Sequence, residues 1–218
     1  MLYGHVADET TDTDSPTTRG PRPRGSVRRA MVEAGVSLAR TGGPDAVVLR
    51  EVTRAVGVVP NAAYRHFAGR EALLAAVRDE ALCELARRMA DGMSQVAARP
   101  HTERGARLRL RAVGMAYLTF AREEPGLFDT AFAAAHPRPS AGGPSDRQTP
   151  FEHLQAALNN LVEAGVIPPE RRPLIEYPIW AAVHGMAMLL RGPLASLSDP
   201  EKQKLEAQAL AFIGSAVR

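Results

Sequence analysis

The stretch that decides the fold is LREVTRAVGVVPNAAYRHFAGREALLAAV, residues 49–77. Its first part, residues 49–56, places apolar side chains at helical spacing, and Gly57 then interrupts the pattern. A second short helix is expected at about residues 60–67, because proline suits the first turn of a helix, where its missing amide hydrogen has no partner to lose. Helix, glycine turn and short helix together form the helix-turn-helix pattern.

Each helix of this unit has an apolar face and a polar face. The side chains expected to face the core are Leu49, Val52, Val56, Ala63 and Phe67. Gly57 provides a turn conformation that a side chain would resist. The side chains left at the surface or at its edge are Asn61, Ala62, Tyr64, Arg65 and His66. The unit therefore presents an outer surface that packing alone does not explain.

Positive charge is concentrated in the same third of the chain. The formal net charge is only +3, but residues 19–70 carry ten arginines against three acidic residues, a net charge of +7. Residues 1–18 carry four acidic residues and no base. Such segregation favours an anionic partner such as nucleic acid, and a solvated basic face is the alternative.

A recognition helix of this type lies in the major groove of DNA and presents its N-terminal residues to base edges. Arg65 would contact guanine or phosphate, Asn61 would read adenine, and the methyl group of Ala62 would touch a thymine methyl. We expect the ring donors of Tyr64 and His66 to contact phosphate, and the alternative for both rings is a core position with one wet edge. The predicted DNA contacts are Arg50, Pro60, Asn61, Ala62, Tyr64, Arg65, His66 and Arg70.

Composition predicts an all-α protein. Apolar residues make up 45% of the chain, aromatic residues only 5%, and runs of alternating β-branched residues are almost missing. Further helices are expected at about residues 26–42, 70–89, 103–123, 127–135, 151–163, 174–191 and 200–217. Thr149 with Glu152 and Ser198 with Glu201 fit the capping box that begins a helix. Residues 136–148, rich in Pro, Gly and Ser, are expected to form a flexible loop.

These elements suggest three parts. Residues 1–23 have too little apolar content to pack and are expected to form a disordered tail. Residues 24–70 would form a helix-turn-helix domain, and residues 71–218 a larger helical domain. No stretch approaches the roughly 20 apolar residues that span a bilayer, and the N-terminus is acidic where a signal peptide is basic. We therefore expect a cytoplasmic protein with no membrane partner.

Motifs for catalysis are missing from the sequence. The six histidines show no metal-ligand spacing, and neither a phosphate-binding glycine loop nor a Gly-x-Ser-x-Gly motif is found. The single cysteine, Cys83, excludes a cysteine-rich metal site. We predict no catalytic residue, no metal and no cofactor. Two alternatives to a sequence-specific regulator stay open: an α-helical enzyme, and an architectural protein that binds DNA without sequence preference or effector.

The stretch quoted above closely resembles the DNA-binding signature of the TetR family. In that signature a leucine-rich helix, an AGVS turn, a Tyr-x-His-Phe helix and a basic-acidic-x-Leu-Leu segment follow in this order, and the resemblance covers about residues 26–80. It implies a three-helix DNA-binding domain, a helical domain that binds a small apolar effector, and a homodimer that represses at palindromic DNA. Val48 and Val59 depart from the family, which has Ser or Thr there to cap a helix and contact phosphate.

A second resemblance covers the C-terminal half. VGMAYLTFAREEPGLF and IWAAVHGMAMLL are similar to a C-terminal type in that family with a Trp-x-x-x-His-Gly signature, here Trp180, His184 and Gly185. The family resemblance implies a dimer interface on the last two helices, with contacts at Ala181, Gly185, Leu189, Leu205, Ala209 and Phe212. The candidate effector contacts are Met115, Phe120, Phe128, Phe132, Phe151, Leu154, Trp180, His184 and Met188. Core packing, with His184 hydrogen-bonded, is the alternative for Trp180 and His184.

Overall fold

The computed structural model describes residues 24–133 and 148–217, and within these ranges it contains helices and no β-strand. The helices are α1 (Arg24–Gly42), η1 (Pro44–Ala46), α2 (Leu49–Val56), α3 (Pro60–Ala63), α4 (Arg70–Ser94), α5 (Glu103–Glu123), α6 (Pro125–Phe132), α7 (Pro150–Glu163), η2 (Pro169–Arg171), α8 (Glu176–Arg191) and α9 (Asp199–Ala216). The predicted all-α class is confirmed. The expected tail at residues 1–23, and all but the last residue of the expected loop at 136–148, lie outside the described residues.

The helix-turn-helix forms at the predicted place, but its second helix is shorter than expected. Gly57 ends α2 in the left-handed conformation, at φ 71°. Helix α3 ends at Ala63, whereas the sequence pattern predicted a helix to residue 67. Beyond Ala63 the backbone tightens, because the amide of His66 donates to the carbonyl of Ala63, three residues back instead of four. Tyr64 and Arg65 therefore lie in a hydrogen-bonded turn that follows the helix.

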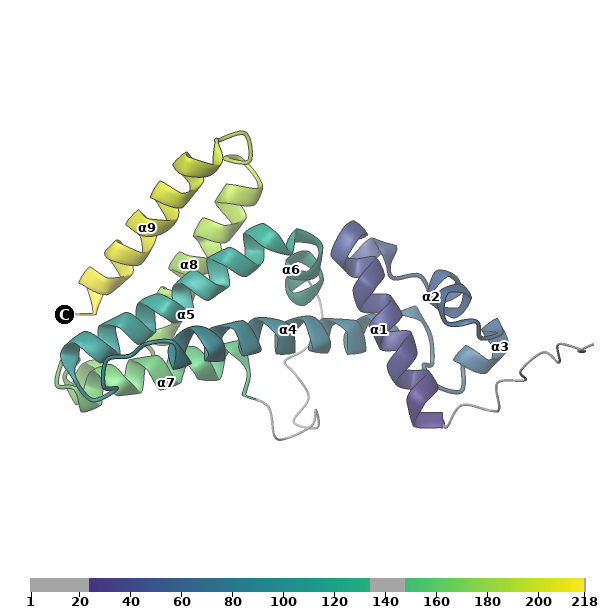
Figure 1. The fold of residues 1–218 in the computed structure, drawn as a ribbon, viewed down its shortest axis with the longest axis horizontal. Helices are drawn as coiled ribbons and strands as arrows, with labels where there is room; N and C mark the ends of the chain where they lie inside the picture. The colour runs from purple at the N-terminus through teal and green to yellow at the C-terminus, as the bar shows by residue number, and fades with distance from the viewer. Residues whose placement is uncertain (1–23, 134–147, 218) are drawn as a thin grey trace, which may run out of the picture.

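Helix α4 is the long central element that joins the two ends of the molecule (Figure 1). Its buried side chains recur every four residues along one face, at Leu73, Val77, Ala81, Leu85 and Met89. The start of α4 packs against α1, and its remainder packs against α5, α6 and α7. Leu73 and Val77, in the first two turns of α4, lie beside Gly35 of α1. The domain boundary near residue 70 stays a prediction.

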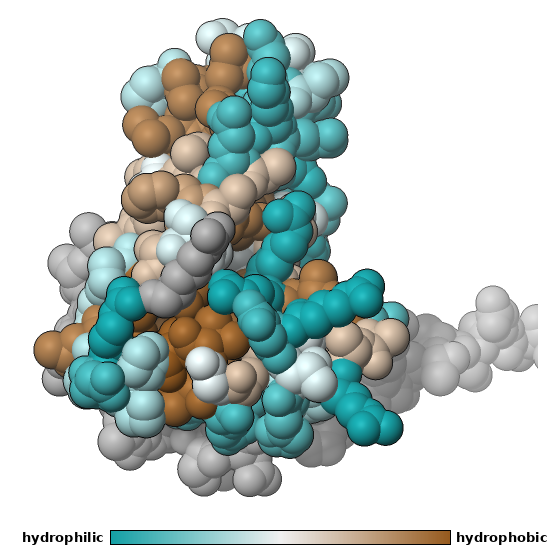
Figure 2. Space-filling view, turned by 90° about the vertical axis from the view of Figure 1, so that its left-hand side faces the viewer, coloured by the Kyte–Doolittle hydropathy of each residue, from teal (hydrophilic) through white to brown (hydrophobic). Residues whose placement is uncertain are grey.

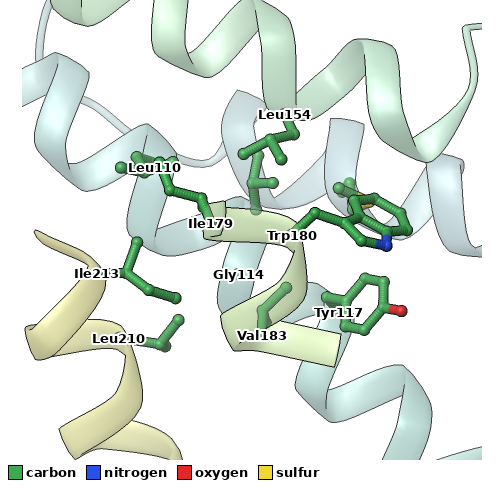
Figure 3. A pocket seen from close by; sticks show the side chains of 11 residues that line it. Leu110, Gly114, Tyr117, Leu154, Ile179, Trp180, Val183, Leu210 and Ile213 are labelled. Carbon is green, nitrogen blue, oxygen red and sulfur yellow. The ribbon is translucent and has the colours of Figure 1, made fainter. Parts of the chain in front are cut away.

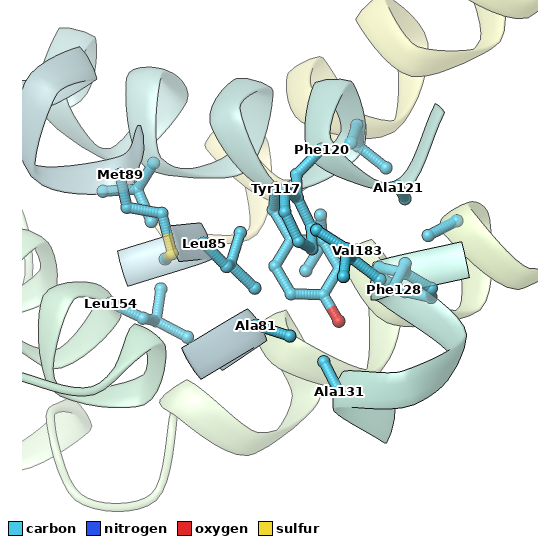
Figure 4. Packing of buried hydrophobic residues seen from close by; sticks show 14 of the residues in the cluster. Ala81, Leu85, Met89, Tyr117, Phe120, Ala121, Phe128, Ala131, Leu154 and Val183 are labelled. Atoms are coloured by element: carbon cyan, nitrogen blue, oxygen red, sulfur yellow. The ribbon is translucent and has the colours of Figure 1, made fainter. Parts of the chain in front are cut away.

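In the C-terminal part, α5, α6 and α7 pack against α4, while α8 and α9 pack against α5 and against each other (Figure 1). Both predicted capping boxes are present, and in them the backbone amides of Thr149 and Ser198 donate to the carboxylates of Glu152 and Glu201. One continuous hydrophobic core runs from α1 to the end of α9, and Figure 4 shows its central part. Among the described helices, none combines the length and apolar character needed to cross a membrane.

Candidate DNA-binding surface and effector site

The predicted core side chains of the helix-turn-helix are buried or half-buried, with Leu49 and Val56 half-buried. Val52, Ala63 and Phe67 are buried, while Tyr64 is 60% exposed and therefore is not a core ring. Arg50, Pro60, Asn61 and Arg65 are also exposed, and Ala62, His66 and Arg70 are half-buried. The exposed residues lie on α2, on α3 and in the turn that follows α3.

The arginines of this surface differ in what holds them. Among the described residues, neither Arg50 nor Arg65 has an ion-pair or side-chain hydrogen-bond partner, so both guanidinium groups are free to meet an anion. Arg54 lies 2.5 Å from Glu51 on the same helix. Arg70 donates to the carbonyl of Pro44 at 2.7 Å and so ties α4 to the segment that follows α1. Arg70 thus has a structural role, and its contact with phosphate stays a prediction.

Two valines occupy the positions that cap the helices of this surface. Val48 precedes α2 and Val59 precedes α3, both with extended backbone, and neither provides a side-chain cap. The departure noted in the sequence therefore leaves the first amides of both helices without the usual hydroxyl acceptor.

Val48→Thr is expected to stabilise the protein. The new hydroxyl would accept a hydrogen bond from the amide of Glu51, the third residue of α2, and should raise the free energy of unfolding by about 1 kcal/mol. Val48 is already exposed and extended, so the change introduces no clash. Urea denaturation of Val48→Thr and of the control Val48→Ala measures the effect. Equal stability of the two variants would show that the hydroxyl forms no cap.

A narrow apolar cavity lies at the centre of the C-terminal domain (Figure 3). Leu154 and Trp180, two of the predicted effector contacts, line it. Its volume is about 20 Å³, room for a single water molecule, whereas ligand pockets occupy about 300–1,000 Å³. An effector would therefore have to enlarge it. The lining residues that sequence reasoning missed include Met89, Leu110, Tyr117, Ile179, Leu210 and Ile213.

Among the described residues that line the cavity, Tyr117 carries a hydroxyl group, and this hydroxyl bonds to His184. The Tyr117 hydroxyl lies 2.7 Å from Nδ1 of His184, and the ring of Tyr117 packs edge-on against Phe128 and Trp180. Figure 4 shows Tyr117 with Phe128, and Figure 3 shows it with Trp180. Burial raises the pKa of Tyr117 and lowers the pKa of His184, because each charged form would lose its hydration. Both groups are therefore neutral at pH 7. His184 is thus hydrogen-bonded, as the core-packing alternative expects, whereas Trp180 lines the cavity.

The other predicted effector contacts are not among the residues that line the cavity. Phe120 and Phe128 are fully buried in the core, and Met188 is 49% exposed at the surface. Met115, Phe132 and Phe151 are half-buried. Phe132 and Phe151 both pack against Trp180, with ring centroids 6.2 and 5.7 Å from it. Phe120 and Phe128 are thus packed in the core of the domain, and an effector contact at any of these residues stays a prediction.

Apolar side chains are exposed on the last two helices. Leu189 on α8 and Phe212 on α9 are 45% and 67% exposed, and Ala181 on α8, another predicted dimer contact, is also exposed. Gly185, Leu205 and Ala209 are half-buried. Figure 2, which views the molecule from the end at which α9 finishes, shows hydrophobic side chains gathered at the surface with hydrophilic ones around them. Exposed apolar surface of this kind is typical of an interface.

The N-terminal and C-terminal domains are joined by ion pairs and by a close backbone contact. Arg40, at the end of α1, pairs with Glu84 of α4 at 2.9 Å and also with Glu124, immediately before α6. Gly126 of α6 lies against the backbone of α1, where a Cβ atom would approach the carbonyl oxygen of Arg40 to 2.7 Å. Helix α6 therefore touches the DNA-binding domain directly as well as through α4.

Two family models match the sequence. One, described as bacterial regulatory proteins of the tetR family, matches residues 31–77, and the other, described as a tetracyclin repressor-like C-terminal domain, matches residues 110–212. A curated relative, the uncharacterized HTH-type transcriptional regulator YobS of Bacillus subtilis (strain 168), is 28% identical over 112 residues. The match covers 51% of this chain and 54% of YobS, so the chain spans about half the length of that relative.

Solved structures share the fold. A protein with unknown function from Rhodococcus sp. RHA1 aligns with a TM-score of 0.65 and 23% identity, over 91% of this chain and 98% of that one. A tetR-family transcriptional regulator from Streptomyces coelicolor aligns with a TM-score of 0.60 and 23% identity, over 90% and 82% of the two chains. The Trp-x-x-x-His-Gly subtype stays a prediction. Because family models match both its DNA-binding and its C-terminal part, the chain belongs to the TetR family of helix-turn-helix transcriptional regulators.

Proposed function

We propose that this regulator is a repressor that binds palindromic DNA as a homodimer and is released by a small apolar effector. The observation that carries the proposal is the surface formed by Asn61, Tyr64 and Arg65, which is exposed and basic and is held on a helix-turn-helix. Arg65 has no partner among the described residues. Phosphate contacts would fix the position of the domain on DNA, and contacts to base edges would give it sequence preference.

The exposed apolar residues of α8 and α9 support the homodimer. A twofold pair through Leu189 and Phe212 would bury surface that is otherwise costly to expose in water. Two recognition surfaces related by that axis read a palindrome when they are about 34–36 Å apart, one turn of the DNA helix. The spacing of the two half-sites thus depends on the C-terminal domain.

The central cavity supports release by an effector. Met89 of α4 lines the cavity, and Leu73 at the start of α4 packs in the core shared with α1. A ligand that enlarged the cavity would therefore act on the helix that carries the DNA-binding domain. By thermodynamic linkage, DNA would weaken the binding of such a ligand by the same factor by which the ligand weakens the binding of DNA.

Competition between two DNA fragments tests the proposed function. A labelled palindrome from the promoter region of the protein's own gene is competed with its unlabelled form and with random DNA of the same length. We expect the palindrome to compete at least about a thousandfold better. An architectural protein would instead bind both fragments equally, with a steep dependence on salt. Light scattering of the free protein and of the complex determines whether a dimer binds.

A further inference from the structure

A second pocket, of about 250 Å³, lies between α5, α6, α8 and α9, apart from the central cavity. One side of it is apolar, with Leu118, Ala187 and Leu190 among its lining residues. Ala187 and Leu190 are buried, while Met188 and Leu189 between them are exposed. The pocket therefore faces inward from α8, on the side away from the surface proposed to pair with a second copy.

The other side of this pocket is charged, and one of its positive side chains has no acidic partner among the described residues. Arg122, Arg191 and Lys202 line it together with a single acid, Glu206. Arg122 lies 2.6 Å from both carboxylate oxygens of Glu206, which is only 3% exposed. Arg191 is paired with Asp129 at 2.6 Å. Within the described ranges Lys202 has no ion-pair partner, so one positive charge is left over.

A buried ion pair beside an open pocket is a poor way to stabilise a fold. Glu206 and part of Arg122 lose hydration in this pair, and well-packed apolar residues often replace such a pair without loss of stability. The pair does supply fixed charges beside an apolar wall, where an ionic ligand would be screened less than in bulk water. Its geometry is therefore suited to recognition.

We propose that this pocket binds a small monocarboxylate with an apolar body. The carboxylate would lie at Lys202 and at the free donors of Arg122, and the apolar body would lie against Leu118 and Leu190. A single negative charge fits, because the lining leaves one positive charge uncompensated. A phosphate monoester carries nearly two charges at pH 7, so its second charge would have no positive partner in this lining.

A ligand in this pocket would lie next to the contact between the domains. Pro125 lines the pocket, and its neighbours on either side, Glu124 and Gly126, pair with and pack against the end of α1. Occupancy of the pocket would therefore bias the position of α6 against the DNA-binding domain. This coupling rests on the proposed function, whereas binding of the ligand does not.

Calorimetry on the full chain, with sodium octanoate as the probe, tests the site. We expect saturable binding of octanoate that Lys202→Gln weakens about tenfold and Lys202→Arg preserves. Lys204→Gln is the matched control, because it removes the same charge from an exposed position of α9 outside the pocket. It should leave the affinity unchanged. Ala195→Phe, at the exposed rim of the pocket, should also weaken binding.

Octanol separates this pocket from the central cavity, whose lining includes no charged side chain. Tighter binding of octanoate than of octanol, lost in Lys202→Gln, supports the charged pocket. Three outcomes would each overturn the proposal. They are equal binding of octanoate and octanol with no effect of Lys202→Gln, equal weakening of binding by Lys202→Gln and Lys204→Gln, and no binding of octanoate. Binding is measured without DNA, so its failure is distinct from failure to recognise an operator.

A second experiment tests the coupling to DNA. Octanoate that releases the palindrome from wild type but not from Lys202→Gln would support the coupling. Octanoate that binds without changing DNA affinity would overturn it.

Discussion

Arg65→Ala should weaken operator binding by about 1–3 kcal/mol, which is about five- to 150-fold in affinity. Arg65 is exposed in the turn that follows α3 and contacts no acid within the described parts of the chain. Its guanidinium therefore contributes nothing visible to the fold and is free for guanine or phosphate. Fluorescence anisotropy with the palindromic fragment measures the loss, and thermal unfolding should show a melting temperature close to that of wild type.

A matched variant separates a local contact from the general effect of charge. Arg104→Ala removes the same charge from an exposed position at the start of α5, in the C-terminal domain. It should change operator affinity little, because charges beyond about 10 Å are screened at 0.1 M salt. Wild-type affinity in Arg65→Ala would remove Arg65 from the predicted DNA contacts.

Tyr64→Ala should also weaken operator binding, since the ring of Tyr64 is 60% exposed and Arg65 follows it in the same turn.

Gly126→Ala should destabilise the protein by about 3 kcal/mol and weaken operator binding with it. The added methyl group would meet the carbonyl oxygens of Ala39 and Arg40, which are backbone atoms and cannot rotate aside. Relief requires α6 to move away from α1, and this movement would also disturb the ion pair between Arg40 and Glu124. Urea denaturation at a fixed protein concentration measures the loss.

Gly214→Ala is the control for the substitution itself. Gly214 lies within α9, and a methyl group there would meet no atom within 4 Å in the free chain. Alanine favours a helix over glycine by about 0.8–1.0 kcal/mol, so this variant should be slightly more stable than wild type. If Gly126→Ala were as stable as Gly214→Ala, the close contact between α6 and α1 would not exist in solution.

Local sequence determined the elements of this fold. The spacing of apolar residues predicted α2, α5 and the start of α4, and both capping boxes formed, because these signals depend on residues about one helical turn apart. The end of α4 was predicted five residues too early, at residue 89 instead of Ser94. The glycine at position 57 placed the turn for the same reason. The end of α3 was predicted four residues too late, since a helix and a tight turn share nearly the same apolar spacing over so short a stretch.

Tertiary structure alone decided which residues meet. Nothing in the sequence pairs Tyr117 with His184, Arg40 with Glu124, or Arg70 with the carbonyl of Pro44, because these partners come from different elements. The same holds for both pockets, whose walls combine side chains from several helices. Helical spacing determines which face of each helix is apolar. How those faces fit together, and where they leave space and unbalanced charge, depends on the packing of all the helices at once.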